Sequence, residues 1–216
     1  MKVGVDSVLL GAWMDVSGTQ RLLDAGCGCG LLALMAAQRL SDDGEGEFNI
    51  DAVDIEAGAV ADSEANFEAS PWAQHLAVRQ ISLQDFADTA APCSYDRIFS
   101  NPPYYDDSLA ARDSARDTAR STDTLSRTDL LFAASKLLAP GGRLSLILPF
   151  DQGKKMILEA TCAGWSLRRQ CFVKTKASRP AKRLLLEFSP DAGLLETETL
   201  VVGDERYREL TSGFYL

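Results

Sequence analysis

Histidine and cysteine are scarce in this chain of 216 residues, which has one histidine, His75, and five cysteines. The cysteines are odd in number and scattered, and they form no C-x-x-C pair, so we expect free thiols in a reducing cytoplasm. So few imidazole and thiolate ligands argue against zinc, and we expect no metal. No apolar run approaches the roughly 20 residues that cross a bilayer, and no signal peptide is recognisable.

Basic residues are outnumbered as well, with 22 Lys and Arg against 31 Asp and Glu and a net charge of −9. Taken alone, this balance argues against a nucleic-acid partner. Seven of the basic residues nevertheless fall between Arg168 and Arg183, a stretch without any acidic residue. A basic block on an acidic body predicts a local footprint for phosphate groups, although a solubilising hairpin would give the same pattern.

The pattern of apolar residues predicts strands alternating with helices over a single domain, residues 1–216. The stretch from Val3 to Trp13 is mixed, and an apolar helix face is expected in it after Asp6-Ser7, which are good cap residues. Further helices are expected near 31–38, 57–70, 125–139 and 154–163. Strands are expected at 21–25, 48–54, 76–81, 95–99, 143–149, 167–174 and 183–188. The fold class is therefore α/β, with a mostly parallel seven-stranded sheet that ends in an antiparallel β-hairpin.

A glycine-rich loop follows the strand at 21–25 and reads Gly26-Cys27-Gly28-Cys29-Gly30. Strand, glycine loop and helix are the nucleotide-binding opening of a doubly wound sheet, where glycines allow the backbone to approach a ligand closely. Asp54 ends the next strand, at a spacing typical of an acid that binds ribose hydroxyls. This loop alone does not separate NAD from S-adenosylmethionine.

Three features favour S-adenosylmethionine. Asp24 suits the ammonium of a methionine tail and would repel a pyrophosphate. Ligands of such sheets lie beyond the carboxyl ends of the strands, where Asp24, Asp54, Ser82 and Asn101 form a row. A dehydrogenase needs an acid or base, and His75 lies outside these strand ends. The expected cofactor-binding residues are Asp24, Gly26, Gly28, Gly30, Asp54, Ile55, Ser82, Leu83 and Asn101.

The stretch Ser100-Asn101-Pro102-Pro103-Tyr104-Tyr105 suits the capture of a planar amine. Asn101 offers a side-chain acceptor, and the two prolines stiffen the turn so that the Pro102 carbonyl points outward as a second acceptor. Tyr104 or Tyr105 offers a ring on which a base can stack. An ordinary turn after a buried strand is the alternative, because Asn-Pro commonly opens turns.

These motifs resemble the Rossmann-like class I methyltransferases that act on exocyclic or amide nitrogen. Over nearly the whole chain the sequence is similar to one bacterial family, the tRNA1(Val) (adenine(37)-N6)-methyltransferases. The stretches that carry this similarity are 1–6 with 9–13, 101–105 and 183–190, and of these the opening Lys2-Val3-Gly4-Val5-Asp6 is the more specific to this family. This resemblance implies a further N-terminal segment before Met1. Relatives often carry an acid where this chain has Ser82, so Asp85 is a second candidate for the adenine contact.

The resemblance implies N6-methylation of adenosine 37 in the anticodon loop of valine tRNA by a monomer that uses no metal. Asn101, Pro102 and Tyr104 would be catalytic: two acceptors hold the amine and one ring stacks on its base. The expected RNA-binding residues are Pro103, Tyr105, Arg120, Lys176, Arg179 and Arg183. Methylation of a guanine amine in ribosomal RNA, methylation of a protein glutamine, and a catalytically impaired cofactor-binding module stay open as alternatives.

Overall fold

The computed structural model describes all residues except 1–3, 43, 45–46, 103–124 and 215–216. Its helices are α1 (Val5–Trp13), α2 (Leu31–Asp42), α3 (Ala57–Glu68), α4 (Leu83–Thr89), α6 (Arg127–Leu137), α7 (Phe150–Cys162) and α8 (Glu205–Thr211), with a 3₁₀ turn η1 (Ala73–His75). Its strands are β1 (Arg21–Ala25), β2 (Asn49–Asp54), β3 (Leu76–Gln80), β4 (Tyr95–Ser100), β5 (Leu138–Pro149), β6 (Ser166–Lys174), β7 (Arg183–Ser189) and β8 (Glu196–Val201).

The strands form one sheet in the order β3-β2-β1-β4-β5-β7-β6-β8. Among these described strands only β7 runs antiparallel to its neighbours, so the expected α/β class and the antiparallel hairpin of β6 and β7 are confirmed. The sheet has eight strands instead of the predicted seven. The missed strand, β8, is an edge strand of alternating Glu and Thr that pairs with β6, and acidic residues are depleted in strands.

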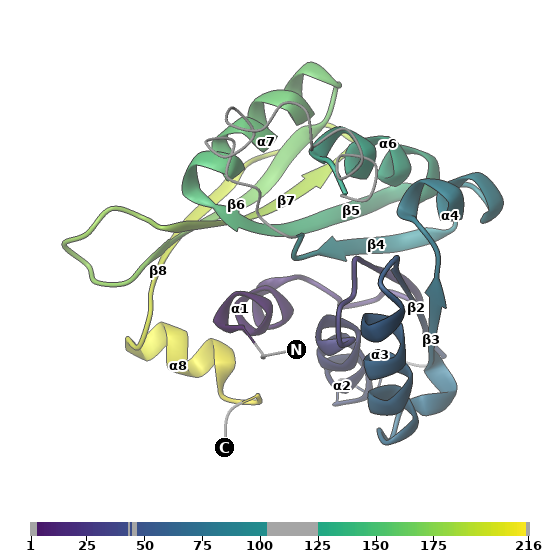
Figure 1. Ribbon diagram of the computed structural model, residues 1–216. Helices are drawn as coiled ribbons and strands as arrows, with labels where there is room; N and C mark the ends of the chain where they lie inside the picture. Colours follow the sequence, from purple (N-terminus) through teal and green to yellow (C-terminus); the bar gives the residue numbers. More distant parts are fainter. Residues whose placement is uncertain (1–3, 43, 45–46, 103–124, 215–216) are drawn as a thin grey trace, which may run out of the picture.

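Helices cover both faces of the sheet (Figure 1). The hydrophobic cluster on one face joins α1, α2 and α3 to the sheet, through residues such as Leu10, Leu32 and Phe67. The cluster on the other face joins α4, α6 and α7, through residues such as Phe86 and Met156. Two layers of helices around a mostly parallel sheet leave its carboxyl edge as the place where loops and side chains can meet a ligand.

Local boundaries differ from the sequence expectations at two places that matter for the site. A helix, α4, begins directly after the third strand because Ser82 caps it: the Ser82 hydroxyl accepts a hydrogen bond from the Asp85 N–H at 3.0 Å. In the chain's first helix, Asp6 and Ser7 are not caps. The N-cap of α1 is Gly4, and the side chains of Asp6 and Ser7 make tertiary contacts instead.

Candidate active site

The sheet order places the carboxyl ends of β3, β2, β1 and β4 side by side. Ser82, Asp54, Asp24 and Asn101 lie at or just beyond these ends. A further bond ties two of the ends together, since the Ser100 hydroxyl donates to the carbonyl of Ala25 at 2.6 Å. The row of polar groups expected from the sequence is therefore present at one edge of the sheet.

The glycine loop is held against the end of β2. The N–H groups of Gly26 and Cys27 both donate to the carbonyl of Val53, at 2.9 and 3.0 Å. Gly26, Gly28 and Gly30 all have positive φ, at 73°, 59° and 76°. At Gly30 a Cβ would also overlap the ring of Phe67, so the loop can follow this path only with glycine at that position.

Asp24 carries a carboxyl group that is completely buried. One oxygen accepts a hydrogen bond from the Ala33 N–H at 3.2 Å, while Oδ1 has no partner among the described residues. Burial, with the nearby charge of Asp54, raises the pKa of Asp24 to about 8. A cationic group beside this oxygen would supply the missing partner and favour the charged carboxylate.

Asp54 has a carboxylate that is fixed from both sides. Its Oδ2 accepts from the Gly28 N–H at 2.9 Å, and its Oδ1 accepts from the Glu56 N–H at 3.0 Å. Each oxygen keeps a lone-pair direction with which it can accept from a sugar hydroxyl. The neighbouring Ile55 is 41% exposed, which leaves an apolar side chain uncovered at this edge.

Ser82 and Asp85 are paired, because the Ser82 hydroxyl donates to the Asp85 carboxylate at 2.7 Å. Leu83, the first residue of α4, is buried and its side chain belongs to the hydrophobic cluster on that face of the sheet. Asp85 lies in the first turn of α4, and its bonds to Ser82 are exposed. Both candidates for an adenine contact therefore lie together at the end of β3.

Asn101 is partly buried, and its side-chain amide donates from Nδ2 to the hydroxyl of Ser7 at 2.8 Å. Pro102, the next residue, is buried. Sequence reasoning missed Ser7, which it treated as a helix cap. Pro103, Tyr104, Tyr105 and Arg120 lie outside the described residues, so their expected roles stay predictions.

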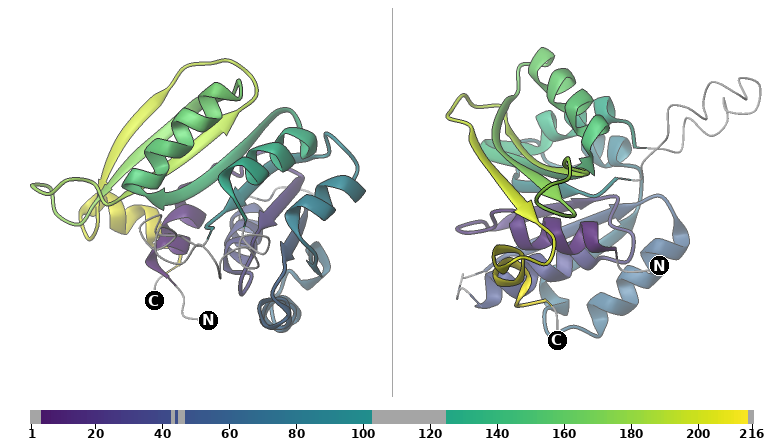
Figure 2. Two further views of the ribbon diagram at one scale, coloured as in Figure 1. Left: turned by 45° about the horizontal axis from the view of Figure 1, so that its top comes forward. Right: turned by 90° about the vertical axis from the view of Figure 1, so that its left-hand side faces the viewer.

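The basic block divides into two parts. Arg168 and Arg169 lie near the start of β6, where Arg168 donates to the carbonyl of Ala192 at 3.0 Å and Arg169 stacks 4.3 Å from the ring centroid of Trp13. The remaining members belong to the β6–β7 loop and its flanks, and this loop projects from the carboxyl edge of the sheet (Figure 2). Lys176 and Arg179 are exposed there. Arg168 and Arg169 thus make contacts within the protein, while a phosphate footprint on the second part stays a prediction.

The single histidine and the cysteines offer no further catalytic or metal-binding group among the described residues. His75 stacks on Phe48 at the amino end of β3, 4.4 Å between ring centroids, and its Nδ1 bonds to the Phe48 carbonyl. Burial raises the pKa of the Cys27 thiol, and all five cysteines are free. The described residues contain no group of three or more His, Cys, Asp or Glu that could hold a metal ion. Within the same residues, no helix is both long enough and apolar enough to cross a membrane.

A doubly wound sheet with this glycine loop, two strand-end carboxylates and an Asn-Pro turn defines a class I, S-adenosylmethionine-dependent methyltransferase. Residues 2–167 match the model of the methyltransferase small domain family. A predicted O-methyltransferase of Agrobacterium tumefaciens has a similar fold, with a TM-score of 0.72 and 17% identity over 97% of this chain and 96% of that one. A Listeria monocytogenes protein, provisionally described as a class I S-adenosylmethionine-dependent methyltransferase, superposes with a TM-score of 0.62 at 14% identity, covering 98% of this chain and 71% of that one.

Sequence similarity is closer to a particular group. The tRNA1(Val) (adenine(37)-N6)-methyltransferase of Edwardsiella ictaluri is 40% identical over 225 residues, which cover all of this chain and 87% of the relative. The protein of the same name from Tolumonas auensis is 41% identical over 222 residues and is covered to 90%. The chain belongs to the tRNA1(Val) (adenine(37)-N6)-methyltransferase family.

Proposed function

We propose that this protein methylates N6 of adenosine 37 in the anticodon loop of valine tRNA, acting as a cytoplasmic monomer. The observation that carries the proposal is the position of Asn101 and Pro102 at the end of β4, beside the end of β1 that carries Asp24 and the glycine loop. An amine held by the turn would lie next to a cofactor held by the loop. Family membership selects the nucleoside, which the turn by itself does not distinguish from other amines.

The cofactor side of the site fits S-adenosylmethionine, which when bound supplies a methyl group activated on a sulfonium. Asp24 has a buried oxygen without a partner, which an ammonium group would satisfy. The contact would be direct if the glycine loop moves slightly, or it would run through a bridging water. Asp54 offers its carboxylate to the ribose hydroxyls, and the exposed Ile55 covers one face of the adenine. The backbone at Gly26, Gly28, Gly30 and Leu83, with Ser82 or Asp85, lines the rest.

On the substrate side, Asn101 and Pro102 act on the amine through two acceptors. An exocyclic amine is a weak nucleophile because its lone pair is delocalised into the ring. Oδ1 of Asn101 and the Pro102 carbonyl accept its two N–H groups and favour a geometry in which the lone pair is free. As the nitrogen takes the methyl group, the methyl–sulfur bond would break with its electron pair left on a neutral thioether, and both acceptors would stabilise the positive charge on nitrogen before a proton passes to water. Tyr104, Pro103 and Tyr105 would hold the unstacked base.

The β6–β7 loop is the proposed contact for the RNA backbone. It leaves the sheet at the edge that carries Asn101, and its exposed Lys176 and Arg179 suit phosphate contacts. Arg183, at the end of the loop, is ion-paired with Asp6 at 2.7 Å, so we assign it a part in fixing the loop as well as in binding RNA. Arg120 would add a further phosphate contact.

The test is methylation of an unmodified valine tRNA transcript with labelled S-adenosylmethionine, followed by nucleoside analysis. We expect N6-methyladenosine, mapped to position 37 by digestion, and no incorporation into a matched transcript with guanosine at that position. Formation of N2-methylguanosine in ribosomal RNA, or of labelled glutamine in a protein, would show that the substrate is one of these molecules and not valine tRNA. Cofactor binding in calorimetry without transfer to any of these acceptors would instead indicate a binding module.

A further inference from the structure

The first turn of α1 contacts the catalytic turn from outside the row of strand ends. Ser7 lies in this turn, and its hydroxyl accepts the hydrogen bond from Asn101 Nδ2 at 2.8 Å, across 94 residues of sequence. The next three residues of α1 are Val8, Leu9 and Leu10, which are 4%, 1% and 0% exposed. Because the helix is anchored by these side chains, the Ser7 hydroxyl has a fixed place relative to the sheet.

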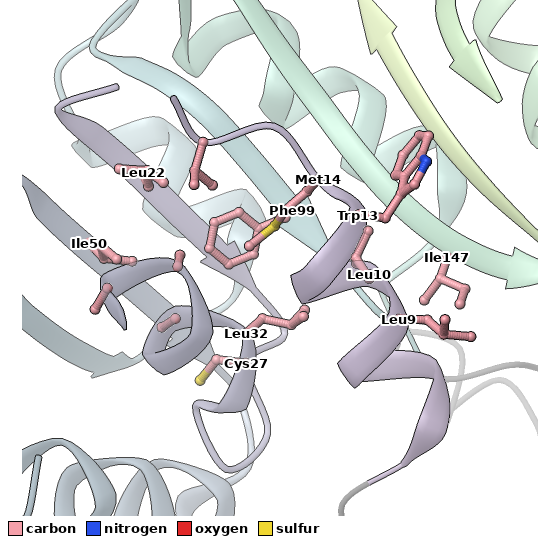
Figure 3. Packing of buried hydrophobic residues seen from close by; sticks show 14 of the residues in the cluster. Leu9, Leu10, Trp13, Met14, Leu22, Cys27, Leu32, Ile50, Phe99 and Ile147 are labelled. Carbon is pink, nitrogen blue, oxygen red and sulfur yellow. The ribbon is translucent and has the colours of Figure 1, made fainter. Parts of the chain in front are cut away.

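The position of the Ser7 hydroxyl is set by the packing of α1 against β4 and β5, the two strands nearest the proposed amine site. Leu9 lies beside Ile147 of β5, and both belong with Phe99 of β4 to one buried cluster (Figure 3). Phe99 is only two residues before Asn101. The same hydrophobic contacts therefore fix the helix that carries Ser7 and the strand that carries Asn101.

A second bond anchors the first turn of α1 to the start of β7. The Asp6 carboxylate accepts from Arg183 Nε at 2.7 Å, and Arg183 is the first residue of β7. In the sheet β5 lies between β4 and β7. Asp6 and Ser7 together thus bridge β4 and β7 over the end of β5, and the bridge joins the turn that holds the amine to the return of the basic loop.

The amide of Asn101 needs such a partner. Its oxygen is an acceptor and its nitrogen carries two donors, so the two ends of the group are not equivalent. A target amine is itself a donor and must meet Oδ1. If the amide turned by 180°, two N–H groups would face the amine and the interaction would disappear. A hydroxyl can donate or accept, and in the structure the Ser7 hydroxyl accepts from Nδ2, so that in this arrangement Oδ1 is the end of the amide that would meet the substrate amine.

We propose that Ser7 is a positioning residue for methyl transfer: it holds the Asn101 amide with Oδ1 toward the target amine, and the Asp6–Arg183 ion pair holds the turn that carries it. This inference rests on the proposed role of Asn101 as an acceptor for the amine. Ser7 itself touches neither the amine nor the methyl group. Its removal therefore affects the rate of transfer and leaves the binding of the cofactor in place.

The kinetic test compares Ser7→Ala, Ser7→Thr and the control Ser41→Ala, a serine at the exposed far end of α2. Ser7→Ala should lower kcat by roughly ten- to a hundredfold, because a misplaced acceptor loses its alignment with the reacting amine. The KM for tRNA, the Kd for S-adenosylmethionine from calorimetry and the Tm should stay close to those of the unaltered protein. Ser7→Thr, which keeps the hydroxyl, should recover most of kcat, and Ser41→Ala should change nothing. Unchanged kcat in Ser7→Ala, or a decrease explained by weaker cofactor binding, would overturn the proposal.

A spectroscopic test separates this inference from the proposed function. The side-chain amide signals of Asn101 are identified in a ¹⁵N correlation spectrum as the pair missing from Asn101→Ala. They should be displaced from the positions typical of a free amide, move toward those positions in Ser7→Ala, and return in Ser7→Thr. A spectrum in which Ser7→Ala leaves the pair unmoved contradicts the positioning role, whichever amine the enzyme methylates. If the pair moves as expected but no N6-methyladenosine forms, the proposed substrate fails and the positioning of Asn101 stands.

Discussion

The two halves of the sheet's carboxyl edge are held in different ways. In the half formed by β3, β2, β1 and β4, polar groups are fixed by backbone bonds: both oxygens of Asp54 accept N–H groups, and Ser100 bonds to Ala25. In the half formed by β5, β7, β6 and β8, the charged groups nearest the edge, such as Lys176 and Arg179, are exposed on a projecting loop.

The difference matches the two ligands expected there. A small cofactor gains from preorganised donors and acceptors, because groups already in place cost no ordering when the ligand binds. An RNA backbone is long and uniformly charged, so cations on long side chains bind it without exact placement. Asn101 and Ser7 lie where the halves meet. We therefore expect substitutions in the first half to have larger effects than substitutions in the second half. We also expect each of them to affect one quantity, such as kcat or the Kd for the cofactor.

The largest effect should come from Asn101→Ala. Removal of the acceptor Oδ1 leaves the amine without its main orienting partner, and deletion of one such stabilising group typically costs about 10²–10³ in kcat. Calorimetry should give a Kd for S-adenosylmethionine close to that of the unaltered protein, because the ribose and ammonium contacts remain. Turnover near the normal level would remove Asn101 from the mechanism.

Much of this edge is predictable from sequence because the information is local. Asp24, Asp54 and Asn101 lie in or directly after apolar runs, and a parallel sheet brings such positions together. The bond from Ser7 to Asn101 is not predictable in this way, since the two residues are far apart in sequence and Ser7 also fits a helix cap. Strand β8 was missed because its Glu-Thr alternation carries little apolar signal. Sequence order likewise does not reveal that Arg168 bonds to the Ala192 carbonyl and Arg169 stacks on Trp13, whereas Lys176 and Arg179 are exposed.

A second prediction concerns Asp24 and pH. Its raised pKa, about 8 against an ordinary 3.8, means that the folded protein binds a proton more tightly than the unfolded chain. The favourable contribution of this carboxyl group to the free energy of unfolding is therefore present at low pH and disappears as pH rises from about 4 to 8. Asp24→Asn cannot ionise, so its stability relative to the unaltered protein should increase with pH, by on the order of 2–4 kcal/mol between pH 5 and 8.

Urea denaturation at several pH values measures this difference. Saturating S-adenosylmethionine should reduce the pH dependence in the unaltered protein, because an ammonium near Oδ1 favours the ionised carboxylate. Calorimetry at pH 7 should likewise detect proton release on cofactor binding, which Asp24→Asn should not show. A pH dependence unaffected by the cofactor would place the ammonium away from Asp24.

Asp54→Asn should act mainly on cofactor affinity. The two carboxylate oxygens of Asp54 accept from the N–H groups of Gly28 and Glu56. An asparagine amide would place its NH₂ group against one of these donors and lose that hydrogen bond. Both the glycine loop and the contact to the ribose would therefore be disturbed. Removal of charge-assisted bonds of this kind costs roughly 1.5–3 kcal/mol, which corresponds to a Kd for S-adenosylmethionine about ten- to a hundredfold weaker. The exposed neighbour Glu56→Gln is the matched control. Equal Kd values for the two variants would contradict the ribose role of Asp54.

The smallest effects per residue should come from the basic loop, and they should depend on salt. Reversing Lys176 and Arg179 together to Glu should weaken tRNA binding at least tenfold at low salt, with a reduction of about two in the slope of log K against log salt, because each cation is expected to neutralise one phosphate. Cofactor affinity should not change.

The control for the basic loop is Lys136→Glu in the last turn of α6, where an exposed ion pair with Asp88 at 2.6 Å lies near the amino end of β4. Because all three substitutions add negative charge to an already acidic protein, a fall in binding common to both variants would reflect net charge. A fall confined to the loop variant, together with its smaller salt slope, would locate the RNA at the β6–β7 loop.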